Sequence, residues 1–142
     1  MALKASTASD IMTENVEVLR EDDSLQTAAE RLAQHDVGAL PVCDDQQQVR
    51  GIVTDRDIVV HGLAQGKDPR KTTVAEIVSS NPVTVGPDDS VQRVTEIMGE
   101  RQIRRVPVVE AGRLIGIISQ GDIAQSVPAD QAGTMLSHIS SM

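Results

Sequence analysis

Apolar residues recur with the spacing of one helical face in two separate segments of the chain. The first segment has them at i, i+3, i+4, i+7 and i+8, and the second keeps three of these positions. They are Leu25, Ala28, Ala29, Leu32 and Ala33 in the first, and Val91, Val94 and Met98 in the second. Asp-Asp-Ser precedes each segment, at 22–24 and 88–90, and such side chains accept hydrogen bonds from the free N–H groups of a first helical turn. The pattern predicts two amphipathic helices.

After each predicted helix come two runs rich in β-branched residues, separated by a polar or glycine-containing turn. This arrangement is typical of a β-hairpin. The runs are Ala39–Cys43 with Val49–Thr54, and Val106–Glu110 with Leu114–Ser119. A short leading strand is predicted before each helix, at Val16–Leu19 and at Val83–Val85. A second short helix is predicted to begin near Thr54 and near Ser119, so the element order is β-α-β-β-α, twice.

The two halves also share residue identities at a nearly fixed offset. A shift of 66 places Ile11 on Ile77 and Pro41-Val42 on Pro107-Val108; after one residue is lost in a loop, an offset of 65 places Asp57 on Asp122. Many ordered identities with a single gap indicate two copies of one unit. We place the copies at 9–62 and 74–127, a connector at 63–73, and tails at 1–8 and 128–142. In the second tail, Met135, Leu136 and Ile139 have the spacing of a short helix.

Composition narrows the classes of partner. The chain has 13 Lys and Arg against 21 Asp and Glu, a net charge of −8, and no Phe, Tyr or Trp. The acidic balance argues against nucleic-acid binding, which depends on a basic surface, and the absence of aromatic residues excludes aromatic cages and membrane-interface belts. There is one cysteine, no run long enough to cross a bilayer and no signal-peptide pattern. We expect a soluble cytoplasmic protein that binds neither nucleic acid nor membrane.

Two sequence motifs occupy matching places in the two copies. They are Gly-Ile-Val-Thr-Asp-Arg-Asp-Ile at 51–58 and Gly-Ile-Ile-Ser-Gln-Gly-Asp-Ile at 116–123, preceded by Leu40-Pro41-Val42 and Val106-Pro107-Val108. On these motifs the chain resembles, over roughly residues 9 to 127, a pair of cystathionine-β-synthase (CBS) domains, and it is similar to their stand-alone, hypoxic response type. The resemblance implies an α/β fold of the α+β kind, with two pseudo-symmetric repeats packed sheet to sheet as one disc-like module. It also implies pairing of modules, and the apolar Val59 and Val60 add to the expectation of a homodimer.

The same resemblance implies a ligand. Members of the family commonly bind AMP, ADP, ATP, NAD or S-adenosylmethionine in clefts between the repeats. By this resemblance Asp57 and Asp122 would hold the ribose, and Thr54 and Ser119 would face the phosphates. The remaining ligand-binding candidates are Ala39, Pro41, Arg56, Arg104, Arg105 and Pro107. No cofactor is required, and an adenine nucleotide would act as the regulatory ligand.

Physical chemistry supports this pairing of hydroxyl and carboxylate. A Thr or Ser at the start of a helix lies beside free backbone N–H groups, which favour an anion. An aspartate three residues later points to the same side and accepts hydrogen bonds from two ribose hydroxyls. A purely structural alternative also fits: Thr54 and Ser119 are N-caps, and Asp57 and Asp122 are acids favoured in a first helical turn. The two interpretations are compatible.

The basic candidates are unequally distributed between the copies. Arg101, Arg104 and Arg105 form the concentrated positive charge of the second copy, whereas Gly38 and Ala39 stand at the matching positions of the first. We expect some of these arginines, or Arg56, to contact phosphates. The alternative is surface ion pairs, for instance with Glu100, which contribute little stability. The asymmetry argues against two equivalent sites.

Metal binding is not predicted from the sequence. His35, His61 and His138 have no ligand spacing with one another, and Cys43 ends an apolar strand, as expected for a small buried hydrophobe. A zinc site shared across a dimer, with His61 or Cys43, stays open as a minor alternative.

The sequence is compatible with two functions and argues against a third. The first is a regulatory module that binds an adenosine-containing ligand and acts in trans on an unidentified protein target. The second is a ligand-free dimeric interaction scaffold with vestigial clefts. The third, an enzyme, is not expected, because the sequence has no catalytic triad order, Rossmann glycine pattern or phosphate-binding loop. Asp55 and Asp57 are two residues apart on a helix and should not share a face as a carboxylate pair.

Overall fold

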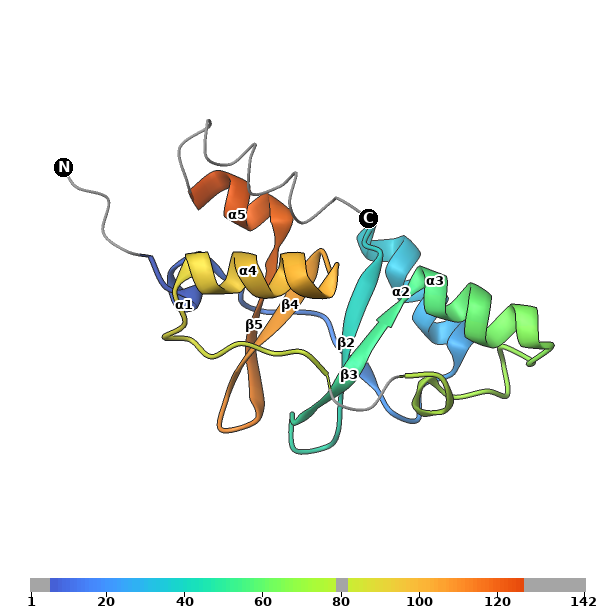
Figure 1. Cartoon of the computed structure of the whole chain (residues 1–142). Coiled ribbons are helices and arrows are strands. Elements are labelled where there is room, and N and C mark those ends of the chain that lie inside the picture. The colour runs from blue at the N-terminus through green and yellow to red at the C-terminus, as the bar shows by residue number, and fades with distance from the viewer. Residues whose placement is uncertain (1–5, 79–81, 127–142) are drawn as a thin grey trace. The chain divides into compact units, whose positions relative to one another are not determined.

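The computed structural model describes residues 6–78 and 82–126, which form two compact units. The first-repeat unit comprises residues 17–82, and the second-repeat unit comprises residues 1–16 together with 83–142. Both mix helices with a small sheet, so the fold belongs to the α+β class (Figure 1). The predicted tail helix around Met135 lies outside the described residues.

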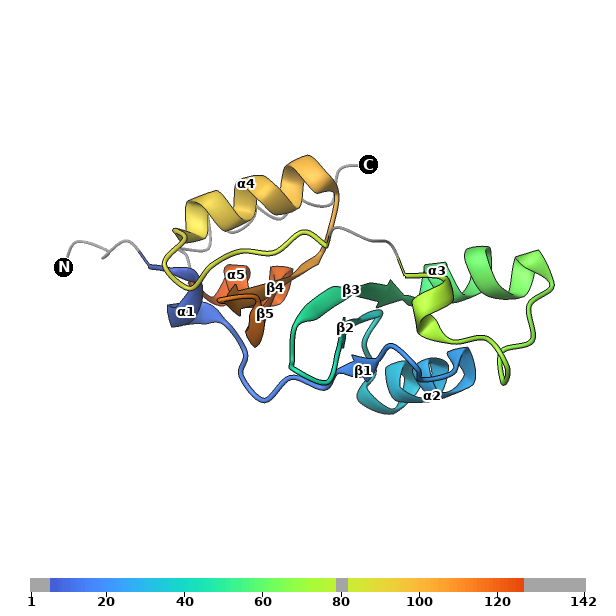
Figure 2. The ribbon, with the colours of Figure 1, turned by 90° about the horizontal axis from the view of Figure 1, so that it is seen from below.

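The first-repeat unit is a three-stranded sheet with one amphipathic helix on it. Strands β1 (Leu19–Arg20), β2 (Ala39–Cys43) and β3 (Val49–Thr54) lie in that order, β1 parallel to β2 and β3 antiparallel to it (Figure 2). Helix α2 (Leu25–His35) begins at Ser24, whose Oγ accepts a hydrogen bond from the Thr27 N–H at 3.0 Å. These bounds confirm the predicted helix and hairpin. The leading strand is shorter than predicted and starts at Leu19, not Val16.

The chain after β3 is helical but irregular. A single turn, α3 (Asp55–Asp57), continues as a π-helix, η1 (Ile58–Gly62), and then as a 3₁₀ turn, η2 (Leu63–Gln65). A Cβ atom on Gly62 would lie 2.7 Å from Leu25 Cδ1, so glycine lets this segment approach α2. The predicted short helix is therefore present, although its hydrogen bonding widens beyond Asp57. A further 3₁₀ turn, η3 (Val74–Glu76), completes the unit.

The second-repeat unit repeats this plan. Its elements are α1 (Ala8–Ile11), α4 (Val91–Arg101), β4 (Arg105–Glu110), β5 (Arg113–Ser119) and α5 (Gln120–Ser126). Strands β4 and β5 form an antiparallel hairpin, and Val85 forms a parallel bridge to Val108 where a leading strand was predicted. The prediction of a strand over Val83–Val85 was thus too long, because only Val85 pairs in this way.

A short segment from each copy packs on the other copy's helix start. In the second-repeat unit the Ala8 N–H donates to Asp89 O at 2.8 Å, and in the first-repeat unit the Val74 N–H donates to Asp23 O at 2.8 Å. Thr7 bridges Ser90 and Thr73 bridges Ser24, two pairs related by the 66-residue shift. The compact units therefore exchange their leading segments, while the linear repeat boundaries given above stay a prediction.

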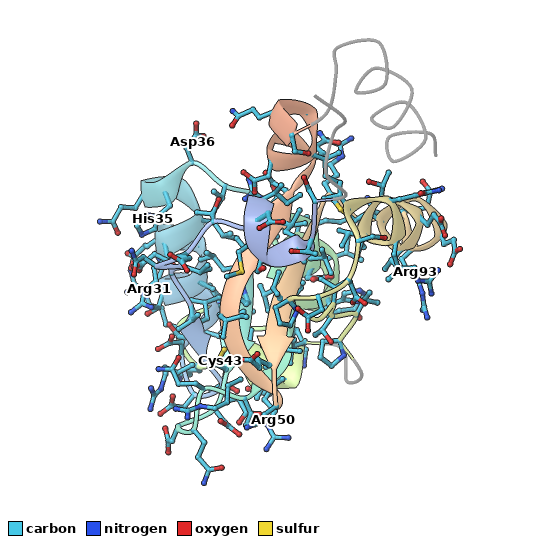
Figure 3. All side chains as sticks on the ribbon, turned by 90° about the vertical axis from the view of Figure 1, so that its left-hand side faces the viewer. Arg31, His35, Asp36, Cys43, Arg50 and Arg93 are labelled. Atoms are coloured by element: carbon cyan, nitrogen blue, oxygen red, sulfur yellow. The ribbon has the colours of Figure 1, made fainter. Side chains whose placement is uncertain are left out.

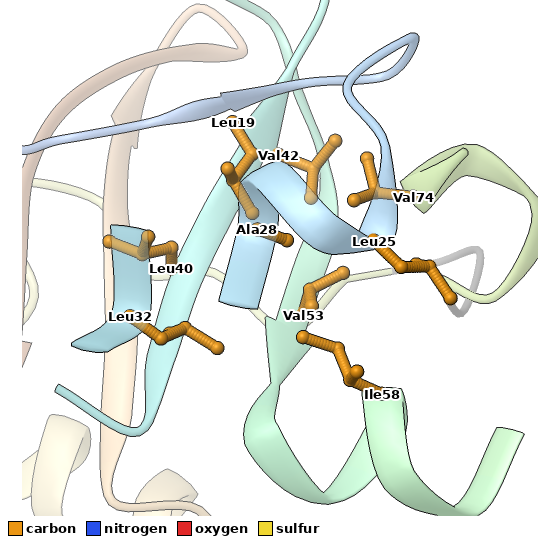
Figure 4. Packing of buried hydrophobic residues seen from close by; sticks show 9 residues of the cluster. All are labelled: Leu19, Leu25, Ala28, Leu32, Leu40, Val42, Val53, Ile58 and Val74. Carbon is orange, nitrogen blue, oxygen red and sulfur yellow. The ribbon is translucent and has the colours of Figure 1, made fainter. Parts of the chain in front are cut away.

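Both cores are built from aliphatic side chains, joined by Met98 in the second-repeat unit. In the first-repeat unit, α2 contributes Leu25, Ala28 and Leu32, which pack on the inward residues of the sheet (Figure 4). The second-repeat core is built alike, with Ala8 from the N-terminal segment fully buried among Val94, Met98 and Ile123. Burial of aliphatic surface of this kind is the main stabilising contribution to each unit. No helix among the described residues is long and apolar enough to span a membrane.

Candidate functional site

The first candidate site is the junction where β3 ends and α3 begins. Thr54 has extended backbone angles and caps the helix: its Oγ1 accepts from the Asp57 N–H at 2.9 Å, and Asp57 Oδ2 accepts from the Thr54 N–H at 3.0 Å. This reciprocal capping box satisfies two backbone N–H groups that the first helical turn would leave unpaired. The Asp55 N–H donates to Gly38 O at 2.9 Å, which ties the helix start to the residue before β2.

The second candidate site, at the end of β5, has the same construction. Ser119 Oγ accepts from the Asp122 N–H at 3.2 Å, and Asp122 Oδ2 accepts from the Ser119 N–H at 2.9 Å. The Gln120 N–H donates to Arg104 O at 3.0 Å. The predicted capping role is therefore observed for both hydroxyl–carboxylate pairs.

A residue that the sequence analysis missed joins the second site. Thr13 Oγ1 lies 3.4 Å from each carboxylate oxygen of Asp122, at the long end of hydrogen-bond distances. Two backbone hydrogen bonds between Thr13 and Ile117, at 2.8 and 3.0 Å, hold this threonine in place. Because 109 residues separate Thr13 from Asp122, no local sequence pattern indicates this contact. Its sequence signal is indirect, since it follows Ile11, which matches Ile77 in the repeat alignment.

The apolar-Pro-Val strands bring further candidates to the two sites. Ala39 lies directly opposite Thr54, and Arg105 lies directly opposite Ser119. Directly opposed side chains stand on the same face of a sheet, so these pairs are neighbours. Pro41 and Pro107 are two residues further along their strands and are buried. The structure thus groups Thr54, Asp57 and Ala39 in one unit, and Ser119, Asp122 and Arg105 in the other.

The arginine candidates are exposed or half-buried, and none of them pairs with an acidic side chain among the residues that the structure describes. Arg56, Arg101 and Arg104 are exposed, and Arg105 is half-buried. Within residues 6–78 and 82–126, the ion pairs involve other arginines, so the proposed surface pairing of Arg101, Arg104 or Arg105 with Glu100 is not found. A guanidinium without a carboxylate partner remains available to an anionic ligand.

The histidines and the cysteine do not assemble a metal centre in the part of the chain that is described. No group of three His, Cys, Asp or Glu side chains there could hold an ion. His35 Nε2 lies 3.4 Å from Glu17 Oε1, and Arg31, one turn earlier on α2, donates to Val18 O at 2.8 Å (Figure 3). Burial raises the pKa of the Cys43 thiol to about 11, so Cys43 is a neutral, buried side chain near pH 7, as expected.

A polar hollow of about 220 Å³ lies in the first-repeat unit, and no residue of the motif at 51–58 lines it. Its lining is Arg20, Glu21, Asp22, Cys43, Asp44 and Asp45. Arg20 pairs with Asp45, and Asp44 accepts from the backbone N–H groups of Gln46 and Gln48 at 2.8 and 3.0 Å. The acidic lining disfavours a phosphate, so we assign no ligand to this hollow.

Comparison with known proteins supplies the wider context. The family model described as the CBS domain matches residues 8–63 and 74–129. Hypoxic response protein 1 of Mycobacterium tuberculosis is 42% identical over 123 residues, which are 87% of this chain and 86% of that protein. The crystal structure of a hypoxic response protein I with two coordinated zinc ions is similar at a TM-score of 0.82 and 42% identity, covering 87% of this chain and 100% of the other.

Two further solved structures carry ligands. CBSX2 in complex with AMP matches with a TM-score of 0.76 and 28% identity, over 90% of this chain and 98% of that one. The CBS domain pair of protein MJ0100, in complex with 5′-methylthioadenosine and S-adenosyl-L-methionine, matches with a TM-score of 0.76 and 31% identity, over 86% and 95%. The ligands named in both structures contain adenosine.

Proposed function

The chain belongs to the CBS domain family, and from this premise we propose that it is a regulatory module that binds an adenosine-containing ligand. CBS-domain pair proteins are regulatory and not catalytic, and relatives of this chain hold AMP, 5′-methylthioadenosine or S-adenosylmethionine. The observation that carries the proposal is the pair of matched hydroxyl–carboxylate sites, Thr54 with Asp57 and Ser119 with Asp122. We further propose that the ligand state is transmitted in trans to a protein target.

The capping bonds leave the groups that such a ligand needs. Thr54 Oγ1 accepts the Asp57 N–H, so its own hydroxyl proton is free to be donated to a phosphate oxygen. Asp57 uses Oδ2 in the cap, and a carboxylate has about four acceptor positions in all, enough for two ribose hydroxyls. Ser119 and Asp122 offer the same groups, with the Thr13 hydroxyl as a further donor to the carboxylate. Capping and binding therefore use different atoms or lone pairs.

Scanning calorimetry against AMP, ADP, ATP, NAD and S-adenosylmethionine tests the proposal. A ligand that binds only the folded state stabilises it by about 2.7 kcal/mol at a concentration 100 times its Kd. We expect at least one compound of this panel to raise the Tm, whereas inosine, offered as a purine control without the adenine amino group, does so less. If no compound raises the Tm at millimolar concentration, ligand binding is refuted and the dimeric interaction scaffold is favoured.

An exposed apolar pair on the first-repeat unit supports assembly into a homodimer, which we propose as the working oligomeric state. Val59 and Leu63 are 55% and 51% exposed, and they lie four residues apart on η1 and η2. They therefore share one side of this helical segment. A second copy that covers both side chains would remove this apolar surface from water.

Sedimentation velocity tests the dimer through this pair. We expect the double variant Val59→Asp/Leu63→Asp to raise the dimer dissociation constant by about 30-fold or more, because two charges replace apolar contacts. His61→Asp is the matched control, since His61 is an exposed residue of the same segment that lies between them in sequence. A wild-type chain that sediments as a monomer at high concentration would refute the proposal.

A further inference from the structure

The residue that opens the helix after each motif strand differs in charge between the two units. The Asp55 N–H donates to Gly38 O at 2.9 Å, and the Gln120 N–H donates to Arg104 O at 3.0 Å, so Asp55 and Gln120 hold equivalent places. Asp55 Oδ2 lies 3.7 Å from the point where a Cβ atom on Gly38 would stand. A carboxylate thus lies over the glycine at the first-repeat site, where the second-repeat site has a neutral amide.

On the strand opposite each motif, a charged side chain is found in the second-repeat unit and an uncharged one in the first-repeat unit. Arg105 lies directly across from Ser119, whereas Ala39 lies directly across from Thr54. Because directly opposed Cβ atoms are about 5 Å apart, the Arg105 side chain starts beside the Ser119 hydroxyl. Arg104 precedes it, at the place that Gly38 takes in the first-repeat unit. The ion pairs found among the described residues do not include Arg104 or Arg105.

These substitutions give the two sites opposite charge. The set Gly38, Ala39, Asp55, Arg56 and Asp57 carries one positive and two negative side chains, a net charge of −1. The equivalent set carries two positive and one negative, a net charge of +1, and consists of Arg104, Arg105, Gln120, Gly121 and Asp122. Charges held within a few ångströms of a ligand phosphate change its affinity strongly, and screening by salt reduces the effect.

We propose that the two sites select ligands by charge. The second-repeat site takes an adenosine compound that carries a 5′-phosphate, and the first-repeat site takes one that is uncharged or cationic at the 5′ position. Arg104, Arg105 and Asp55 are the residues that set this selectivity. The inference rests on the proposed function, because it assigns a ligand class to each of the sites described there.

Isothermal titration with AMP and with adenosine tests the selectivity one site at a time. The variant Asp57→Ala keeps the second-repeat site, and we expect it to bind AMP at least about tenfold more tightly than adenosine. The variant Asp122→Ala keeps the first-repeat site, and we expect it to bind adenosine at least as tightly as AMP. Raising the NaCl concentration from about 0.05 to 0.5 M should shrink the AMP preference of Asp57→Ala.

Exchange of the charged residues supplies the decisive controls. In the Asp57→Ala background, we expect Arg104→Gly/Arg105→Ala to bring the preference for AMP over adenosine down to about parity. In the same background, Arg104→Lys/Arg105→Lys should retain most of this preference, because both positive charges are kept. Added to Asp122→Ala, Asp55→Gln should raise the AMP-to-adenosine affinity ratio severalfold. Equal ratios at the two sites would overturn the selectivity and leave the proposed function standing. A wild-type chain that binds neither AMP nor adenosine would also overturn the selectivity, and the proposed function would fall with it only if the calorimetry panel shows no binding of ADP, ATP, NAD or S-adenosylmethionine either.

Discussion

The double variant Asp57→Ala/Asp122→Ala is expected to lose at least about 100-fold in affinity for whichever adenosine compound binds, because the site's acceptors for the ribose hydroxyls are removed. Each lost carboxylate would leave two ribose hydroxyls unpaired in the bound state. A hydrogen bond to a charged group contributes about 1.5–3 kcal/mol, so loss of even one strong bond costs about tenfold or more in affinity. Isothermal titration of the double variant beside the wild type measures the loss directly.

The structural role of these carboxylates requires a matched control. Asp57 and Asp122 each accept a backbone N–H in a capping box, and Asp10 does the same for the Thr7 N–H at 2.9 Å in α1. Asp10→Ala therefore removes a cap of the same chemistry without touching either motif, and it should bind ligand as the wild type does. Far-UV circular dichroism should be used to check that each variant is folded. A double variant that stays folded and binds normally would refute the ribose role of both aspartates.

The pKa of Asp10 is lowered by its hydrogen bonds to Thr7, so the α1 cap depends on pH. Because the folded-state pKa lies below its usual value, the carboxylate stabilises the cap above that usual value and loses this contribution as the pH falls through the lowered one. Comparison of Asp10→Ala with the wild type should therefore be made near neutral pH, where the cap is fully formed.

The elements that could be predicted from sequence are those that local chemistry defines. Ser24 and Ser90 cap α2 and α4 where the pattern places them. Strands β2 and β3 have the predicted bounds because runs rich in β-branched residues on either side of a polar turn are typical of a hairpin. The irregular helix after Asp57 was not predictable in the same way. Its π-helical widening accompanies the close approach of Gly62 to Leu25, a tertiary contact between segments 37 residues apart in the sequence.

The residues of the candidate sites also divide into those that local sequence patterns identify and one that they do not. Thr54, Asp57, Ser119 and Asp122 were identified because the motif occurs twice, and each pair is joined by local hydrogen bonds. Thr13 was missed because its contact with Asp122 depends on the exchange of leading segments, which periodicity does not report. A capping box can be recognised in the sequence because its residues are three apart. The unit on which a leading segment packs depends on contacts between residues far apart in the sequence, which no local pattern indicates.

Because the N-terminal segment packs in the second-repeat unit, we expect a substitution at Ala8 to destabilise that unit. Ala8 is fully buried in the aliphatic core of that unit, and its N–H donates to Asp89 O at 2.8 Å. The substitution Ala8→Asp would place an unpaired charge there, and a buried charge without a partner costs about 3–5 kcal/mol. We expect a loss of that order in the free energy of unfolding. Since the chain has no Trp or Tyr, urea unfolding followed by far-UV circular dichroism is the suitable measurement.

The neighbouring residue gives the control for Ala8→Asp. Ser9 is exposed in the same helical turn, so Ser9→Asp adds the same charge to the surface and should change the free energy of unfolding by no more than about 0.5 kcal/mol. Because the segment also carries Thr13, Ala8→Asp should weaken ligand binding measured in the Asp57→Ala background, where the second-repeat site remains. If Ala8→Asp and Ser9→Asp unfold at the same urea concentration, the N-terminal segment is not part of the second-repeat core, and the exchange of leading segments is wrong.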